Sequence, residues 1–336
     1  MKEIGSEFHL TKLDKSCGIQ SCDRGSMTFS GRTAIETVLK NIPNAKKAVL
    51  PSYCCESMIV PFYKAGIEVS FYDVWYDESL HINVVIPDDA DILLLCNYFG
   101  FKNIMPDVGS FKKRGGIVIE DITHSFLSKK QYCNQSDYIV ASLRKWEPII
   151  CGGYCSAIKG QLKYIPDNEP ADDFIRLKQQ AMKLKAEYLI DCNSLKKTEF
   201  LQMFVESNSW IADNYSGLSI DSWSKEYLLT VDIQRQREVR CANAHVLYDG
   251  LKDRVQFLFS EEKMDCPLFV PIILHKDRDR IRRGLTEKSI YCPIHWPKPQ
   301  GCESDLYDLE LSLICDQRYN EEDMKRIVSV LNELLY

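Results

Sequence analysis

Ile117-Val118-Ile119-Glu120-Asp121-Ile122-Thr123-His124 is the stretch of this sequence that decides its fold. The apolar run Ile117 to Ile119 predicts a short strand that is buried on both faces, and Asp121 follows it almost at once. A second strand is predicted from Tyr138 to Leu143, and Lys145 comes shortly after it. Residues that follow buried parallel strands lie at the carboxyl edge of the sheet, which is where open α/β sheets bind their ligands.

Strand and helix patterns alternate on either side of this stretch, from about residue 30 to residue 160. Apolar residues recur at helical spacing in Thr33 to Ile42 and in Ser57 to Ala65, and a third helix is predicted from Pro106 to Arg114. The extended segments between them are Ala48 to Leu50, Val69 to Val74 and Asp91 to Phe99. This alternation predicts an α/β fold with a mostly parallel sheet covered by helices.

The second half of the chain is more helical in pattern. Asp221 to Leu251 is predicted to form one long helix, and a last helix is predicted from about Glu321, with Asn320 as its cap. The length of 336 residues suggests two closely joined units. We predict a large domain over residues 1–215, with the N-terminal segment included, and a smaller C-terminal α/β domain over residues 216–336, entered through the long helix.

The composition excludes several classes of protein. Hydrophobic residues make up 45% of the chain and charged residues 27%, which supplies a large core and excludes global disorder. The 42 basic and 48 acidic residues give a net charge of −6. The chain therefore lacks the excess of basic residues that is typical of nucleic-acid-binding proteins. No apolar run reaches the ~18 residues of a membrane span. Met1 to Thr11 lacks the basic-then-apolar layout of a signal peptide.

The fourteen cysteines are expected to be free thiols in a reducing, cytoplasmic compartment. Their close pairs, Cys17/Cys22, Cys54/Cys55 and Cys151/Cys155, include no C-x-x-C, so the sequence predicts no metal site. It also lacks the motifs of P-loop, dinucleotide-binding, zinc-protease and serine-hydrolase sites.

Four places in the sequence could carry chemistry. Ser30 to Ala34 opens the first predicted helix, where free N–H groups and the helix dipole favour an anion, although an ordinary helix cap is as good an interpretation. Asp121 could pair with the protonated ring nitrogen of a cofactor or simply cap a helix. His124 could lie against the same ring or be a structural histidine. Lys145, seven residues before Gly152-Gly153, is a candidate for a depressed pKa and a Schiff base, or a solvated lysine.

In this order, the residues resemble those of one family, the DegT/DnrJ/EryC1/StrS sugar aminotransferases. Glu120 to Ser125 is close to the family's E-D-A-A-[QH]-[AS], and Lys145 with Gly152-Gly153 matches its Schiff-base lysine and the E-G-G after it. Gly31 to Ala34 resembles its G-T-x-A phosphate loop. Further matches by position extend the resemblance to nearly the whole chain, at Val49 to Tyr53, Gly66 to Asp73, Asn97 to Gly100, Tyr291 to His295, Leu311 to Leu313 and Asn320 to Asp323.

The resemblance implies a fold and a chemistry. The fold would be type I of the pyridoxal-phosphate-dependent enzymes, with a mostly parallel, seven-stranded-type sheet, assembled as a homodimer with active sites at the interface. Lys145 would hold pyridoxal phosphate covalently and act as the base, and Asp121 would keep the pyridine nitrogen protonated. The rest of the cofactor site would be Gly31, Arg32, His124 and Ser142. The implied reaction moves an amino group from an amino acid, such as glutamate, to a keto-sugar, with a nucleotide as the expected carrier.

The chain also departs from the family pattern. Arg32 replaces a threonine of the phosphate loop, and Cys55 replaces the aromatic residue that stacks on the cofactor ring, so that stacking moves to Tyr53 or is lost. Ser142 stands three residues before the lysine, where the family serine stands five before it. Asn214-Tyr215-Ser216 lacks the arginine of the N-Y-R segment, which in the family reaches the active site of a partner subunit.

Two alternatives to transamination follow from these departures. One is another reaction on the same fold, such as dehydration of a keto-sugar, although dehydratases of the family carry a histidine where this chain has Lys145. The other is a non-catalytic sensory or partner-binding protein that has kept the fold. Uptake of cofactor, with its yellow colour, separates an enzyme from a binding module.

Overall fold

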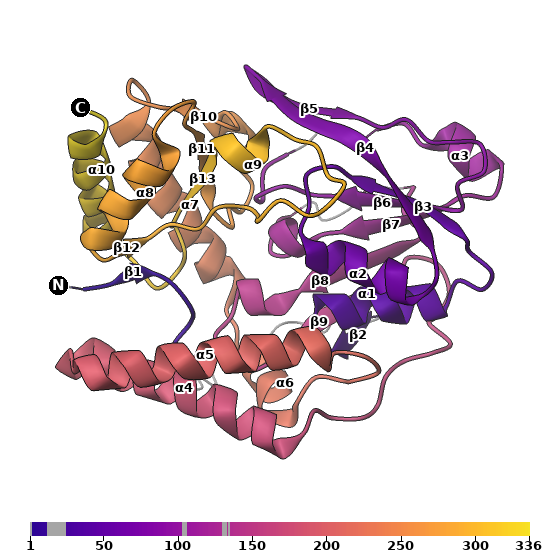
Figure 1. The fold of residues 1–336 in the computed structure, drawn as a ribbon, viewed down its shortest axis with the longest axis horizontal. Helices are drawn as coiled ribbons and strands as arrows, with labels where there is room; N and C mark the ends of the chain where they lie inside the picture. The colour runs from indigo at the N-terminus through magenta and orange to yellow at the C-terminus, as the bar shows by residue number, and fades with distance from the viewer. Residues whose placement is uncertain (1, 12–24, 103–105, 130–132, 134) are drawn as a thin grey trace.

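The computed structural model describes residues 2–11, 25–102, 106–129, 133 and 135–336. In this part of the chain the largest sheet has eight strands, in the order β2-β9-β8-β7-β6-β3-β4-β5 (Figure 1). Strands β9 and β5 run antiparallel to their neighbours, and the other neighbours pair in parallel. The predicted mostly parallel sheet is confirmed. It is one strand wider than the seven-stranded type because β5 folds back on β4 as a hairpin.

The strands of this sheet are short, apart from β4. Their bounds are β2 Gly25–Thr28, β3 Lys47–Pro51, β4 Glu68–Asp77, β5 Ser79–Asn83, β6 Ile92–Cys96, β7 Ile117–Asp121, β8 Tyr138–Ser142 and β9 Gly153–Ala157. All five residues of β6 are buried, because the strand lies between β3 and β7 and helices cover the sheet. The strands predicted around Ala48, Val69, Ile92, Ile117 and Tyr138 are therefore confirmed.

Helices α1 (Gly31–Lys40), α2 (Glu56–Lys64) and α3 (Gly109–Lys113) lie between these strands. Helix α1 begins after Ser30, whose hydroxyl accepts a hydrogen bond from the N–H of Thr33. Its apolar face packs over β8 and β9, which places the first turn of the helix beside the carboxyl end of β8.

Two long helices, α4 (Asp172–Asp191) and α5 (Ser194–Asp213), form a hairpin against the lower side of the molecule in Figure 1. The single helix predicted from Asp221 to Leu251 is wrong. The chain forms α6 (Ser222–Leu228) and α7 (Ile233–Leu251) instead. Asp232 has an extended backbone and its side chain accepts from the N–H of Arg235, so it starts a new helix inside the predicted one.

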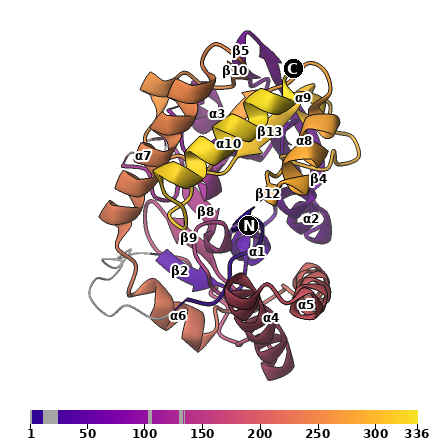
Figure 2. The ribbon, with the colours of Figure 1, turned by 90° about the vertical axis from the view of Figure 1, so that its left-hand side faces the viewer.

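The C-terminal part has its own antiparallel sheet, β10 (Gln256–Phe257), β11 (Val270–Ile273) and β13 (Glu310–Leu313). Helices α8 (Arg278–Glu287), α9 (Leu306–Leu309) and α10 (Glu321–Leu334) pack around it, and Figure 2 shows α10 alongside α7. The predicted cap of the last helix is confirmed, since Asn320 and Asp323 form a reciprocal capping box.

The N-terminal segment crosses to this C-terminal part. Strand β1 (Ile4–Gly5) pairs in parallel with β12 (Ile290–Tyr291), and the chain then passes above the α4–α5 hairpin (Figure 1). The predicted domain division at residues 215 and 216 stays a prediction.

Twelve cysteines fall within the described residues, and all of them are free thiols. The predicted pair Cys17/Cys22 lies outside the described residues. Across the described ranges, no helix is both long enough and apolar enough to cross a bilayer.

Candidate active site

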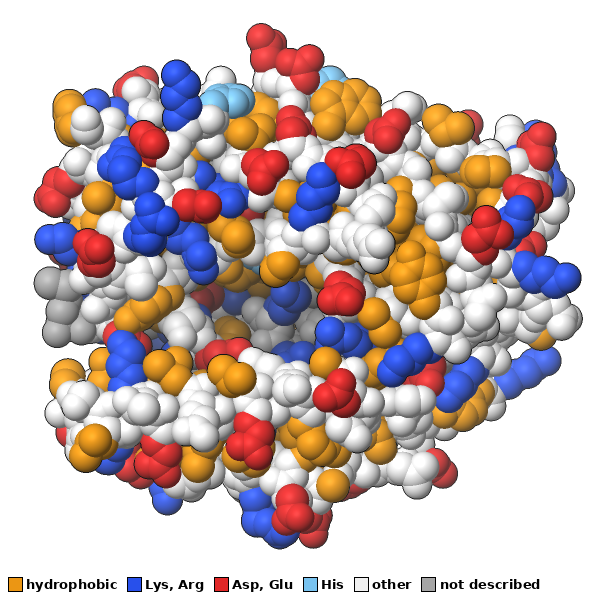
Figure 3. Space-filling model, viewed as in Figure 1, with side chains coloured by type: hydrophobic (Ala, Val, Ile, Leu, Met, Phe, Trp, Pro, Cys, Tyr) orange, Lys and Arg blue, Asp and Glu red, His pale blue; other side chains and the backbone are white. Residues whose placement is uncertain are grey.

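One cavity of about 310 Å³ brings together the residues that the sequence nominates for the cofactor site, apart from Tyr53, the suggested substitute for the stacking aromatic. It lies at the carboxyl ends of β7 and β8 and at the first turn of α1. Figure 3 shows the molecule hollowed above the α4–α5 hairpin, with Lys and Arg side chains inside the hollow. The nominated residues that line the cavity are Gly31, Arg32, Asp121, His124, Ser142 and Lys145.

The first turn of α1 forms the anion-binding end of this cavity. The side chain of Ser30 accepts the N–H of Thr33, and the Ser30 carbonyl accepts the N–H of Ala34 at 2.9 Å. By helix geometry, the N–H groups of Gly31 and Arg32 have no acceptor within the helix. A methyl group on Gly31 would lie 3.1 Å from the Cβ of Ser142. Glycine therefore lets the end of β8 approach the helix start, and Ser142 stands beside the free N–H groups.

Gly153, the second glycine of the pair after Lys145, also allows close packing at the start of α1. A Cβ at Gly153 would lie 2.2 Å from the carbonyl oxygen of Ser30, closer than any side chain can come. Strand β9 can therefore lie against the residue that caps α1 only because position 153 has no side chain.

Asp121 is the last residue of β7, and its side chain is buried. One carboxylate oxygen, Oδ1, accepts the N–H of Thr123 at 2.8 Å. Burial raises the pKa of Asp121, and the bonds from Thr123 and the charge of Lys145 only partly offset this. The carboxylate is therefore a group that a further cation in the cavity would stabilise.

Lys145 ends the short 3-10 turn η2 (Leu143–Lys145) that follows β8. Burial lowers the pKa of Lys145 and neighbouring Arg144 adds to the effect, while Cys55 and Asp121 oppose it. A lowered pKa increases the share of neutral amine, which is the form that reacts with a carbonyl group.

His124 lies in the 3-10 turn η1 (Thr123–Ser125) that follows β7. Its Nδ1 accepts the N–H of Phe99 at 3.2 Å, so a neutral ring carries its proton on Nε2. Burial holds the pKa of His124 well below its usual range, and a positive charge on His295 or on Lys145 would lower it further. The ring is therefore a neutral hydrogen-bond donor inside the cavity.

Several lining residues were not found from the sequence. They are Glu7, Thr123, Arg144, Asn208 and Trp296 among others. Trp296 directly follows the Y-x-P-[LI]-H match, so extending that motif by one residue would have included it.

Tyr53, the predicted substitute for the stacking aromatic, is not among the lining residues of the cavity. It packs on Tyr98, Trp296 and Tyr307 instead. Among the described residues, Trp296 is the large aromatic side chain that lines the cavity.

The segment Asn214-Tyr215-Ser216 packs on its own chain. The carbonyl of Tyr215 accepts the hydroxyl of Thr33 at 2.8 Å, and the Tyr215 ring is buried. The Ser216 hydroxyl donates to Glu36 of α1. Over the residues with described positions, no group of three or more His, Cys, Asp or Glu side chains could hold a metal ion.

The sequence matches no protein-family model and no curated protein. Its structure, however, is similar to many solved structures. DesV of S. venezuelae, solved with a ketimine intermediate, shares 14% identity and a TM-score of 0.64 over 93% of this chain and 85% of its own. Spr1654 from Streptococcus pneumoniae, named as a sugar aminotransferase and solved in a PLP-form, shares 11% identity and a TM-score of 0.64 over 93% and 87%. A DegT DnrJ EryC1 StrS aminotransferase from Brucella abortus shares 14% identity and a TM-score of 0.61 over 92% and 85%.

These likenesses extend over most of the chain, and they establish its fold. The α/β architecture is that of fold type I, the fold of these aminotransferases, as the sequence resemblance predicted.

Proposed function

We propose that this protein is a pyridoxal-phosphate-dependent aminotransferase that moves an amino group from an amino acid to a keto-sugar. The observation that carries the proposal is the meeting of Lys145, Asp121 and the first turn of α1 in one cavity. These three features come from separate parts of the chain, and together they supply an amine, a carboxylate and an anion-binding end.

The residues around the cavity fit pyridoxal phosphate. The free N–H groups of Gly31 and Arg32, the Ser142 hydroxyl and the Arg32 guanidinium would hold the phosphate. At the other end, the Asp121 carboxylate would accept a hydrogen bond from the ring nitrogen. That contact would stabilise the ionised form of this buried acid, whose pKa is raised.

The chemistry divides between the cofactor and the protein. Pyridoxal phosphate, when bound, supplies a reactive aldehyde and a ring that withdraws electrons. Lys145 would bind the cofactor covalently through Nζ, and the amine, once released, would take the proton from the α-carbon of the amino donor and pass it to the cofactor. His124 would donate from Nε2 to an oxygen of the cofactor or substrate. Trp296 lines the same cavity.

Finer parts of the proposal rest on similarity alone. DesI, another protein of this fold, was solved with its TDP-sugar product, at 10% identity and a TM-score of 0.63. We therefore extend the proposal to a nucleotide-linked sugar as the acceptor and glutamate as the donor. The homodimer and the cytoplasmic location that the sequence resemblance implied are part of the same proposal.

An absorption experiment tests the function. Purified protein mixed with pyridoxal phosphate should become yellow, and the colour should bleach on adding an amino donor. Borohydride reduction followed by peptide mapping should label Lys145, and Lys145→Ala should abolish both label and bleaching. A protein that stays colourless with added cofactor would favour the binding-module alternative. A label on another lysine would refute the assignment of Lys145.

A further inference from the structure

His295 and Glu310 are buried titratable residues that the proposed function leaves without a role. Both belong to the C-terminal part, where His295 follows β12 and Glu310 is the first residue of β13. Glu310 is fully buried, as is Ser312 on the same strand, and His295 is only 4% exposed. Burial of such groups is costly unless hydrogen bonds satisfy them, so their bonding partners indicate what they do.

A continuous chain of hydrogen bonds joins the two residues. One oxygen of the Glu310 carboxyl group, Oε2, accepts the backbone N–H of His295 at 2.7 Å, which fixes the orientation of the carboxyl group. The other oxygen, Oε1, is hydrogen-bonded to the hydroxyl of Ser312. That hydroxyl also lies 2.8 Å from Nδ1 of His295. Ser312 therefore stands between the acid and the imidazole.

The Ser312 hydroxyl has one proton, so it can donate to only one of these two partners. When Glu310 is ionised, the hydroxyl donates to the carboxylate, and its oxygen accepts the proton on Nδ1 of His295. When Glu310 is protonated, the carboxyl group donates to Ser312, and the hydroxyl donates to a bare Nδ1. The charge of Glu310 thus decides which ring nitrogen of a neutral His295 carries the proton.

The other ring nitrogen of His295 faces a cavity. His295 lines a second cavity, of about 430 Å³, which Lys145 also lines. Because Ser312 occupies Nδ1, the nitrogen left for the cavity is Nε2. The ring of His124 lies 5.3 Å from that of His295, so two imidazoles stand near the proposed reactive amine. Nε2 of His295 is an acceptor there when Glu310 is ionised and a donor when it is protonated.

Both imidazoles stay neutral, but they differ in what holds Nδ1. Burial keeps the pKa of His295 well below its usual range, and a positive charge on Lys145 would lower it further. The Nδ1 atom of His124 accepts the N–H of Phe99, a backbone donor that does not titrate. The proton of His124 therefore stays on Nε2, which makes this ring an internal control for His295.

Glu310 changes its charge near neutral pH. Burial raises its pKa from 4.5 to about 8, although its hydrogen bonds and the positive charge of Arg278 oppose the rise. Tyr53 and Cys292 are further titratable groups that interact with Glu310. Burial raises the pKa of both, to about 12 for Cys292, so they stay neutral while Glu310 titrates.

We propose that Glu310, Ser312 and His295 form a proton relay, in which the charge of Glu310 sets whether Nε2 of His295 accepts or donates a proton at the cavity. When a cationic group in the cavity gives a proton to Nε2, the Nδ1 proton passes to Ser312 and the hydroxyl proton passes to Glu310. The donor loses its positive charge and Glu310 its negative charge, while His295 and Ser312 end neutral. Glu310 acts through His295 and is therefore a positioning residue.

The relay itself needs no cofactor, but its use in the reaction rests on the proposed function. There the amine of Lys145 would give its proton to the relay and take it back.

Nitrogen-15 NMR of the histidine rings tests the relay in the cofactor-free protein. As the pH rises through about 8, Nε2 of His295 should lose its proton and Nδ1 should gain one. The nitrogen shifts of His124 should show no such exchange. His295→Gln and His124→Gln assign the signals to the two rings.

Glu310→Gln is the most direct variant. The N–H of His295 requires an oxygen, so the amide NH2 of glutamine would face Ser312 and imitate a protonated Glu310. His295 should then keep its proton on Nε2 throughout the titration. Ser312→Ala removes the link, so the exchange should be lost although Glu310 remains. Glu303→Gln, which removes an exposed acid paired with Lys298, is the matched control and should leave the exchange intact.

The outcomes separate this inference from the proposed function. The relay is overturned if the His295 proton stays on one nitrogen in the parent protein, or if the exchange persists in Glu310→Gln. Its use in the reaction is tested by the pH profile of bleaching with an amino donor. The rate should rise as the pH passes about 8, and Glu310→Gln should lose this rise while Glu303→Gln keeps it. A protein that takes up no cofactor fails the proposed function, and the NMR titration still decides the relay.

Discussion

Asp121 is the residue on which the proposed chemistry depends most directly. Its carboxylate is buried at the end of β7 and has one backbone hydrogen bond, from Thr123. Its pKa is raised by burial, so the ionised form needs a positively charged partner. A protonated pyridine nitrogen is such a partner.

We expect Asp121→Asn to lower turnover severely. A buried hydrogen bond to a charged group contributes ~1.5–3 kcal/mol, which alone corresponds to a factor of about 10–100 in rate, and loss of the ring proton adds to this. Stopped-flow bleaching with an amino donor measures the rate. The unfolding midpoint of the variant serves as the control for folding. A near-normal rate would show that Asp121 only caps the turn after β7.

Arg32 replaces a threonine of the family's phosphate loop, so its contribution to phosphate binding can be tested. We expect Arg32→Ala to raise the Kd of pyridoxal phosphate tenfold or more, ~1.4 kcal/mol, because a guanidinium can hold a phosphate with two parallel bonds. Fluorescence titration measures the affinity. Arg176→Ala, at an exposed site on α4, is the control and should have no effect. An unchanged Kd together with a raised KM would instead assign Arg32 to an acidic substrate.

The sequence could predict individual residues only where a short motif contains them. The E-D-x-x-H and K-x6-G-G spacings nominated Asp121, His124 and Lys145, and the structure brings these three residues to one cavity. Their roles there stay predictions. Glu7 and Asn208 could not be found in this way. They reach the cavity through long-range packing of the N-terminal segment and of α5, and no local pattern records such contacts.

At the scale of elements, hydrophobic spacing predicted the parallel strands β3, β4, β6, β7 and β8 of the large sheet, but not β2, β5 or β9. The error in the helix from Asp221 to Leu251 has a local cause. Apolar residues recur through the break, but Asp232 caps a new helix and the Thr230 hydroxyl donates to the Tyr227 carbonyl at 2.7 Å. Side chains that bond to the backbone end a helix without interrupting its apolar pattern.

Strand β13 carries a buried acid whose titration should be measurable. Glu310 accepts the N–H of His295 at 2.7 Å and the hydroxyl of Ser312, and burial raises its pKa from 4.5 to about 8. The folded state therefore binds a proton that the unfolded state has released. This contribution to stability is fully present below about pH 4.5 and is lost as the pH rises to about 8.

We expect Glu310→Gln to remove this pH dependence. Between these limits the free energy of unfolding of the parent protein should fall by up to ~1.4 kcal/mol per pH unit relative to the variant. Urea unfolding of both proteins at several pH values measures it. A difference between parent and variant that stays constant with pH would contradict the raised pKa.

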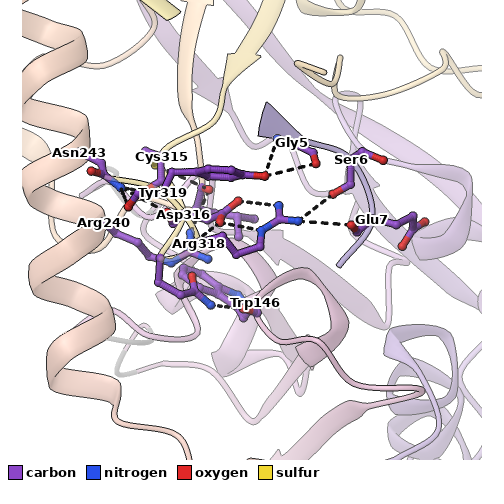
Figure 4. A network of polar contacts seen from close by, with 12 residues as sticks. Gly5, Ser6, Glu7, Trp146, Arg240, Asn243, Cys315, Asp316, Arg318 and Tyr319 are labelled. Carbon is purple, nitrogen blue, oxygen red and sulfur yellow. Dashed lines mark hydrogen bonds and ion pairs between the residues drawn. The ribbon is translucent and has the colours of Figure 1, made fainter. Parts of the chain in front are cut away.

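At the scale of the whole molecule, the N-terminal segment connects parts that are distant in sequence. Arg318 donates to the carbonyls of Ser6 and Glu7 while it pairs with Asp316, as Figure 4 shows. Lys185 of α4 also donates to the Glu7 carbonyl. The segment thus joins the C-terminal part to the α4–α5 hairpin, and its Glu7 lines the candidate active-site cavity.

We expect Arg318→Gln to loosen this connection and to lower stability by about 3 kcal/mol or more, because buried Asp316 loses its cation. Hydrogen exchange of residues 4–10 should speed up, and the midpoint of urea unfolding should fall. Arg280→Gln, which removes only an exposed pair with Asp277, is the control. Equal effects of the two changes would show that Arg318 does not fasten the segment.

The contact of Gly153 with the Ser30 carbonyl also limits which amino acids position 153 can accept. Every codon change that alters residue 153 adds at least a Cβ, which would overlap the Ser30 oxygen at 2.2 Å. The first turn of α1 would then have to move, together with the anion-binding end of the cavity. A library containing all twenty amino acids at position 153, selected for function, should return glycine alone, while exposed Gly160, with nothing near its would-be Cβ, should tolerate substitution as far as its positive φ allows.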